Sequence, residues 1–252
     1  PASFCGVWGL RTTHGRFSID RAMPLAPSFD TVGWFARDLG ALGAASAAFG
    51  IGVGAGAPTD RLLFPVDIWA RASAETVAAL AQMVARLQTQ VAPLTPMLAA
   101  PGGLEDWREA FRIHQGREVW RVHGDWVARR NPAFGAGIAA RFAMAKGITD
   151  DEFAWAEAQR KEISDSLLAQ LGESAVIVLP TSPGPAPLRA SDQATQDDFR
   201  ARALEMLCLA GHAGLPQLSM PAGTADGGPV GLSIMGPRGG EELLLATAAA
   251  IA

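Results

Sequence analysis

The sequence contains no tyrosine and only two lysines among its 252 residues. Lys146 and Lys161 stand in the sequences AKGITD and QRKEIS, which are typical of solvent-exposed helix ends and helix surfaces. A lysine that acts as a general base must lie beside a nucleophile, and burial or nearby charge must lower its pKa. Neither lysine fits that description, so the residues themselves predict no serine–lysine catalytic pair within this chain.

Cysteine is equally scarce, with only Cys5 and Cys208. Two isolated cysteines form no disulfide framework or metal-ligand spacing, so we interpret the chain as belonging to a reducing, cytoplasmic compartment. A disulfide between them is the weaker alternative. Cys5 and His14 offer a thiol and a base, but the apolar sequence SFCGVWG is more typical of a buried, unreactive cysteine.

Clustered metal ligands are also absent from the sequence. His114 and His123 are the best-placed pair of histidines, but nine residues at about 100° each put them on opposite sides of one helix. We therefore expect neither a metal ion nor a cofactor. The pattern GxGxxA can be drawn from Gly50 to Ala55, but an Ala-rich helix precedes it where a dinucleotide-binding turn requires a strand.

Charge and hydropathy argue against two classes of partner, nucleic acids and membranes. The 21 basic and 25 acidic residues are spread along the chain and leave a formal charge of −4, without a basic stripe that could follow a phosphate backbone. The uncharged run 39–57 consists mostly of alanine and glycine, which favour a membrane only weakly. We expect neither nucleic acid nor a membrane as a partner, and we interpret this run as a buried helix and a loop.

Hydrophobic periodicity predicts alternating strands and helices without a domain boundary. We expect strands at 61–67, 90–97, 173–180, 215–221 and 229–236. We expect helices at 38–49, 74–87, 150–171, 195–211 and from 241, and one or two helices within 105–130. The strand ESAVIVLP is almost wholly apolar, which is typical of a strand buried on both faces. The fold class is therefore α/β, with a mixed or parallel β-sheet sandwiched between helices.

Several motifs at the two ends of the chain occur in a recognisable order. The chain begins PASFCGVWGLRTTHGRFS and continues with APSFDTVGWFARD, and its last third contains PTSPGPAP, AGHAGLPQLSMPAG and PVGLSIMG. Together they resemble the amidase signature family immediately after its nucleophilic serine. Arg11 and Thr12 depart from the lysine and proline usual in its GLKPT motif. The segments SFDTVGWFARD and EVWRVHGDWVARRNPAFGAGI look most like the plant indole-3-acetamide amidases and their bacterial relatives.

The resemblance implies a Ser–cis-Ser–Lys triad and an oxyanion-binding glycine loop, all of which would precede Pro1. We therefore expect residues 1–252 to be the C-terminal portion of a single amidase signature domain, with the nucleophile about four residues before Pro1. Because four extended residues span at most about 14 Å, Ser3 and its neighbours would lie beside the acyl pocket. No catalytic side chain is assigned within the chain itself.

The function implied is hydrolysis of a small aryl or otherwise apolar primary amide to a carboxylic acid and ammonia. We expect the chain to form one wall of the cleft, at the carboxyl ends of strands and along the aromatic 107–126 region. The candidate substrate-binding residues are Phe4, Cys5, Trp120, His123, Thr181 and Ser182. For the tryptophans, core packing is the competing interpretation, and for His123 it is packing or a hydrogen bond.

Two alternatives remain at this stage. The chain could be a non-catalytic family member that serves in a complex, or the glutaminase-type component of a tRNA-dependent amidotransferase. The tryptophan-rich middle favours an apolar substrate over glutamine. The expected partners are therefore a small-molecule amide and the N-terminal half of the same domain, while a homodimer is left open.

Overall fold

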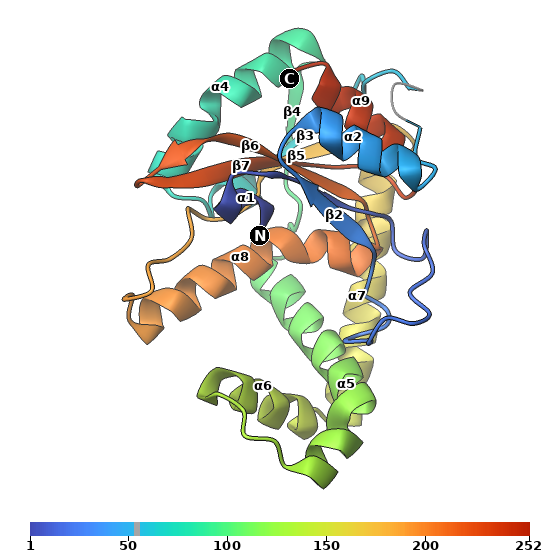
Figure 1. Ribbon diagram of the computed structural model, residues 1–252, viewed down its shortest axis with the longest axis vertical. Coiled ribbons are helices and arrows are strands. Elements are labelled where there is room, and N and C mark those ends of the chain that lie inside the picture. Colours follow the sequence, from blue (N-terminus) through green and yellow to red (C-terminus); the bar gives the residue numbers. More distant parts are fainter. Residues whose placement is uncertain (53–55) are drawn as a thin grey trace.

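The computed structural model describes residues 1–52 and 56–252, and within them one mixed sheet of seven strands forms the centre of the molecule (Figure 1). The strands are β1 (Trp8–Arg11), β2 (Gly33–Ala36), β3 (Leu62–Pro65), β4 (Leu94–Met97), β5 (Val176–Pro180), β6 (Gln217–Ala225) and β7 (Gly228–Met235). Their order is β2-β1-β6-β7-β5-β3-β4. Strand β3 runs parallel to β4 and β5, and the other pairs are antiparallel.

Helices cover both faces of this sheet. They are α1 (Ala2–Cys5), α2 (Leu39–Ala48), α3 (Val66–Trp69), α4 (Ala74–Gln90), α5 (Leu104–Arg130), α6 (Ala136–Gly147), α7 (Asp150–Leu171), α8 (Gln193–Ala213) and α9 (Glu241–Ala249). In Figure 1, α2, α4 and α9 lie above the sheet and α5, α7 and α8 lie below it. Among the described residues, no helix combines the length and the apolar character needed to cross a lipid bilayer.

Strand β5 shows why the sheet needs two covering layers. All five of its residues are buried, as its apolar sequence predicts. Val176 and Val178 belong to the core under α4 and α9, whereas Ile177 and Leu179 belong to the core under α5, α7 and α8. Alternate residues of a strand point to opposite faces, so one apolar run joins two cores. The predicted α/β sandwich is confirmed, with a mixed sheet.

The helix boundaries follow the sequence signals. Thr149 and Glu152 form a capping box at the start of α7, and Gly172 ends that helix. Helix α5 is one continuous helix that ends at Asn131, in the left-handed conformation. Sequence periodicity missed the short elements α1, β1, β2 and α3, and also α6. The loop predicted after α2 includes residues 53–55, which lie outside the described residues.

Arg160 of α7 fixes the loop that leads into β2. Its guanidinium donates to the Ser28 carbonyl at 2.8 Å and to the Ser28 hydroxyl at 2.5 Å. Glu118 accepts the Ser28 backbone N–H at 2.9 Å, and the Arg160 guanidinium stacks 4.2 Å above the Phe29 ring. Arg160 also donates to the His212 carbonyl at 3.1 Å, so α7, α8 and this loop are held as one unit.

His212 is a buried histidine at the end of α8. Its Nε2 donates to the Trp107 carbonyl at 2.9 Å, while Nδ1 is buried without a partner among the described residues. Burial lowers the pKa of His212 to about 4, and the nearby Arg160 and His114 act in the same direction. His212 therefore binds a proton near pH 6.5 in the unfolded chain, but only near pH 4 in the folded chain.

We predict that acid destabilises the protein through His212. The contribution of neutral His212 to the free energy of unfolding is complete above pH 6.5. It decreases by roughly 3 kcal/mol as the pH falls towards 4. His212→Gln keeps a donor for the Trp107 carbonyl but does not titrate. The free energy of unfolding, from urea denaturation followed by tryptophan fluorescence, should fall less between pH 7 and 4.5 in the variant. Equal acid sensitivity in variant and wild type would contradict this.

Candidate functional site

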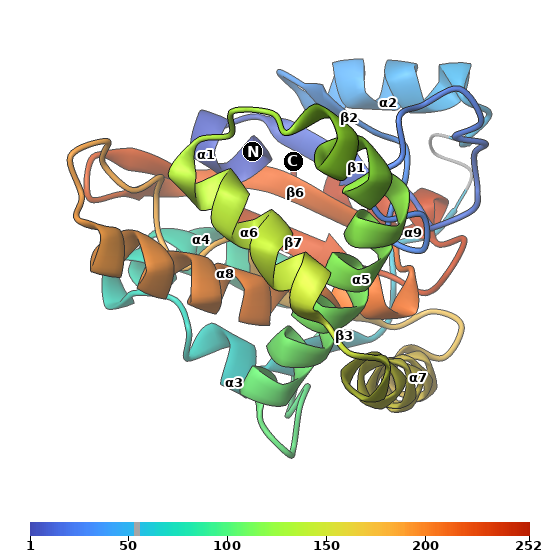
Figure 2. The same ribbon diagram turned by 90° about the horizontal axis from the view of Figure 1, so that it is seen from below.

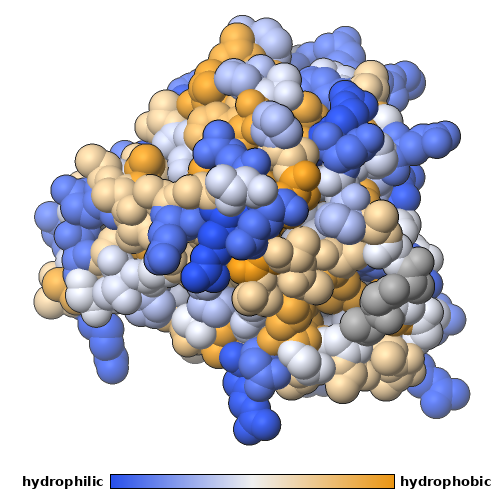
Figure 3. All heavy atoms as spheres, turned by 90° about the horizontal axis from the view of Figure 1, so that it is seen from above, coloured by the Kyte–Doolittle hydropathy of each residue, from blue (hydrophilic) through white to orange (hydrophobic). Residues whose placement is uncertain are grey.

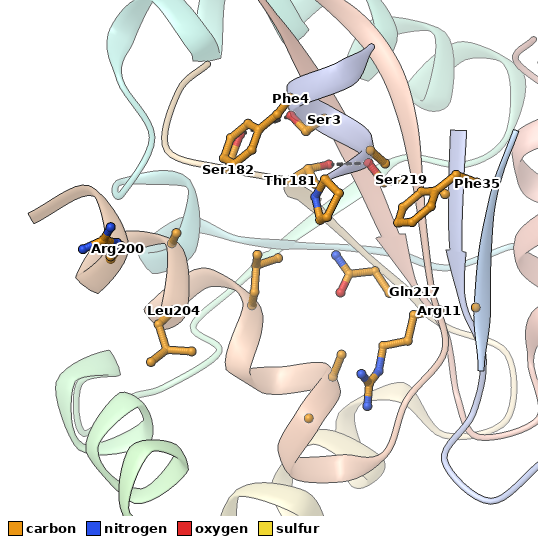
Figure 4. A pocket seen from close by; sticks show the side chains of 18 of the residues that line it. Ser3, Phe4, Arg11, Phe35, Thr181, Ser182, Arg200, Leu204, Gln217 and Ser219 are labelled. Carbon is orange, nitrogen blue, oxygen red and sulfur yellow. Dashed lines mark hydrogen bonds between the residues drawn. The ribbon is translucent and has the colours of Figure 1, made fainter. Parts of the chain in front are cut away.

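A large cavity lies against one face of the sheet, between α1, the β1–β6 strands and α8 (Figure 4). Its volume is about 1210 Å³. Figure 2 shows α8 and α6 on this side of the sheet, and residues of both helices line the cavity. Five phenylalanines line its walls: Phe4, Phe29, Phe35, Phe111 and Phe199. A cavity so lined suits an aryl or aliphatic ligand.

The opposite face offers a hollow of different character (Figure 3). It lies between α2 and α9, has a volume of about 580 Å³, and is lined by alanine, glycine, leucine and proline. No polar side chain of the described residues lines it. Since a site for a small molecule needs a few convergent polar groups, the larger cavity is the candidate site.

Strand register puts polar residues on the cavity side of the sheet. Arg11 pairs directly with Gln217, and Gly9 pairs with Ser219. Residues two apart on a strand, and residues directly opposite on its neighbour, share one face. All four residues line the cavity.

Four side chains form a hydrogen-bonded row, which we call the polar stripe: Thr181, Gln217, Ser219 and Ser233. The Thr181 hydroxyl lies 3.0 Å from the Ser219 hydroxyl and 2.8 Å from the Ser233 hydroxyl. Gln217 donates to the Ser233 hydroxyl at 2.9 Å. The stripe runs from Thr181, which directly follows β5, across β7 to β6. Three of its members, Thr181, Gln217 and Ser219, line the cavity as a polar floor.

The chain's first residues form a wall of the same cavity. Helix α1 ends at Gly6, which adopts a left-handed conformation with φ of 62°. The Ser3 hydroxyl accepts the Gly231 N–H at 2.9 Å and lies 3.2 Å from the Ser182 hydroxyl. Because Ser182 donates to the Gly184 carbonyl at 2.7 Å, Ser3 is the donor to Ser182. Both hydroxyls are structural, and neither adjoins a base.

Arg11 carries a partly buried charge at the site. Burial lowers the pKa of its guanidinium, while the nearby Asp30 acts against that shift. One Nη2 hydrogen bond goes to the Phe29 carbonyl at 3.0 Å, and Nε is buried without a partner among the described residues. Asp30 instead accepts the backbone N–H groups of Leu25 and Ala26, at 2.8 and 3.1 Å.

Three of the six candidate substrate-binding residues come together at the cavity: Phe4, Thr181 and Ser182. Cys5 follows Phe4 but does not line the cavity, and its predicted burial is wrong because the structure leaves it exposed. Trp120 and His123 do not line the cavity; they lie against Lys146 and Phe142 of α6, respectively. His123 also donates to the Pro24 carbonyl at 2.9 Å, so it is hydrogen-bonded as in the competing interpretation.

Sequence reasoning named Thr181 but not the other members of the polar stripe, and among the aromatic residues of α5 it named Trp120 and not Phe111. Phe111 lines the cavity, whereas Trp107 is part of the core. The overlooked signal was a serine inside each of the apolar strands QLSM and GLSIM, since buried polar side chains need hydrogen-bond partners. Both lysines are exposed, as predicted. The described residues contain no cluster of three metal-ligating side chains.

Comparison with known proteins gives the family. Residues 1–48 and 119–245 match the family described as Amidase. "Amidase 1" of Arabidopsis thaliana is 29% identical over 97% of this chain and 65% of its own length. A component of the glutamyl-tRNA(Gln) amidotransferase of Deinococcus radiodurans is also 29% identical, over all of this chain and 61% of its own length.

The same fold occurs in a crystal structure of an amidase, with a TM-score of 0.85 and 22% identity over 99% of this chain and 58% of that one. The chain thus spans less than two thirds of the length of the relatives it matches. The family match covers more than half of the chain and includes the motifs described above at its two ends. The chain belongs to the amidase signature family.

Proposed function

We propose that the protein hydrolyses a small aryl or otherwise apolar primary amide to a carboxylic acid and ammonia, and that the cavity binds the acyl part of this substrate. The observation that carries the proposal is the position of α1. Residues 1–4 form part of the wall of an aromatic cavity, next to Thr181 and Ser182. A segment preceding Pro1 would therefore enter the cavity directly.

In this proposal the reactive groups belong to polypeptide that precedes Pro1, and this chain is the C-terminal portion of a single amidase domain. A lysine would draw a proton through a cis-serine, the second serine would attack the amide carbonyl, and backbone N–H groups would hold the oxyanion. Water would then release the acid from the acyl-enzyme. Two features support a catalytic lysine in preceding polypeptide. Lys146 and Lys161 are both exposed, and the chain spans only 65% and 61% of the lengths of two relatives.

The cavity supplies two kinds of contact for such a substrate. Aromatic side chains, with Phe4 and Phe199 at 5.9 Å between ring centroids, provide an apolar surface for an aryl group. The polar stripe offers hydroxyl and amide groups that can donate to a carbonyl or accept from an amide N–H. This combination supports binding of a neutral amide group on an apolar body.

The glutaminase-type component of an amidotransferase is the second candidate, because the Deinococcus relative matches the whole chain. Glutamine carries an α-ammonium group that needs an acidic partner. Asp30 is the only acidic side chain of the described residues that lines the cavity, and backbone N–H groups already occupy it. The cavity therefore favours an amide without a positive charge.

The cysteine usage supports a cytoplasmic location as part of the same proposal.

The first test of this function is hydrolysis by the complete gene product. We expect ammonia release from indole-3-acetamide and phenylacetamide at a kcat/KM well above that for glutamine, because the cavity is aromatic. An enzyme-coupled ammonia assay measures both. Preference for glutamine would favour the amidotransferase component, and no release from any amide would favour a non-catalytic member.

Thr181→Val tests the polar stripe. The substitution keeps the side-chain shape but removes the hydroxyl that joins Ser219 and Ser233, leaving two buried hydroxyls short of a partner. We expect kcat/KM for phenylacetamide to fall about tenfold and unfolding free energy by about 1–3 kcal/mol. Thr181→Ser retains the hydroxyl and is the matched control. Full activity in the valine variant would show that the stripe does not serve the substrate.

A further inference from the structure

The Arg11 guanidinium is a partly buried charge without a matching counter-ion, and its Nε is fully shielded from solvent. No carboxylate of the described residues comes within the 4.0 Å ion-pair distance of it, and its Nε has no hydrogen-bond partner. The nearest acid that acts on it, Asp30, is held by two backbone N–H groups. Withdrawing a charge from water without a partner costs free energy, so this arrangement favours an anion from elsewhere.

The charges that surround the cavity favour the same kind of ligand. The charged side chains that line it are Arg11, Asp30, Arg141, Arg189 and Arg200. Four positive groups therefore face one negative group, although the chain as a whole carries a formal charge of −4. A concave surface with an excess of one charge raises the local concentration of ligands of the opposite charge.

The neighbours of Arg11 make a site of defined chemistry. Gln217 stands opposite it in the β1–β6 register, and Figure 4 shows both side chains extending into the same part of the cavity. With one Nη2 hydrogen bond used by the Phe29 carbonyl, the guanidinium keeps four N–H groups, including the orphaned Nε. A planar guanidinium with free N–H groups matches the two oxygens of a carboxylate.

We propose that Arg11 binds a carboxylate on the substrate, so that the amide cleaved in this cavity belongs to an anionic molecule. The proposal rests on the proposed amide hydrolysis and narrows its substrate class to an apolar, aryl-type amide with a carboxylate remote from the amide. Gln217 assists from the facing strand. The aromatic walls contact the body between the two groups.

Two matched substrates test this in the complete protein: 4-carbamoylbenzoate, and 4-methylbenzamide, in which a methyl group replaces the carboxylate. We expect wild-type kcat/KM to favour 4-carbamoylbenzoate at least tenfold, and this preference should shrink as salt concentration rises. In Arg11→Gln, kcat/KM for the carboxylate substrate should fall about 100-fold, at least ten times more than for 4-methylbenzamide. Arg11→Lys should restore part of the preference. Arg37→Gln is the matched control, because Arg37 is 89% exposed and does not line the cavity.

Binding of terephthalate separates this proposal from the proposed function. Calorimetry should show wild-type binding that Arg11→Gln weakens about 100-fold, whether or not either amide is cleaved. Equal wild-type kcat/KM for the two amides, or equal losses in Arg11→Gln, would overturn the carboxylate site. Undetectable binding of terephthalate to the wild-type protein would also overturn the carboxylate site. It would indicate that an acidic residue of the preceding polypeptide pairs with Arg11. If terephthalate binds but neither amide is cleaved, only the proposed hydrolysis fails.

Discussion

The antiparallel pairing of β1 with β6 is the contact on which the site depends. It joins residues near the start of the chain to residues more than 200 positions later, and it places Arg11 opposite Gln217 and Gly9 opposite Ser219. A shift of one residue would turn these side chains to the other face of the sheet. The pairing also seats α1 beside β6 and β7, so the polar stripe and the first residues border one cavity.

The site combines fixed and unsatisfied polar groups. The hydroxyls of Ser3, Thr181 and Ser182 all have partners, which makes them a rigid lining. Arg11 is different, because it is partly buried and has no ion-pair partner among the described residues. Arg160 stabilises the loop beside it through Ser28 and Phe29. A rigid cavity with one uncompensated charge is better suited to selecting a ligand than to performing chemistry alone, which agrees with the proposal that preceding polypeptide supplies the reactive serine.

Local patterns predicted the strongly periodic elements well. The apolar run of β5, the capping box of α7 and the family motifs at both ends need only neighbouring residues to be recognised. The four residues of β1 are too few for a periodic signal, and their pairing with β6 is a long-range contact. Trp120 and His123 were attractive because aromatic residues favour binding sites, but periodicity does not tell which turn of a 27-residue helix faces a cavity. Finding Arg11 and Gln217 required the register of two strands.

The most direct test of the account is the site of covalent labelling by a serine-reactive fluorophosphonate. The complete protein is labelled, digested and mapped by mass spectrometry, with 4-carbamoylbenzoate as a competitor. The account predicts one adduct on a serine about four residues before Pro1, and protection by the competitor. An adduct on Ser3 or Ser182, or hydrolytic activity without any labelled serine, would contradict it.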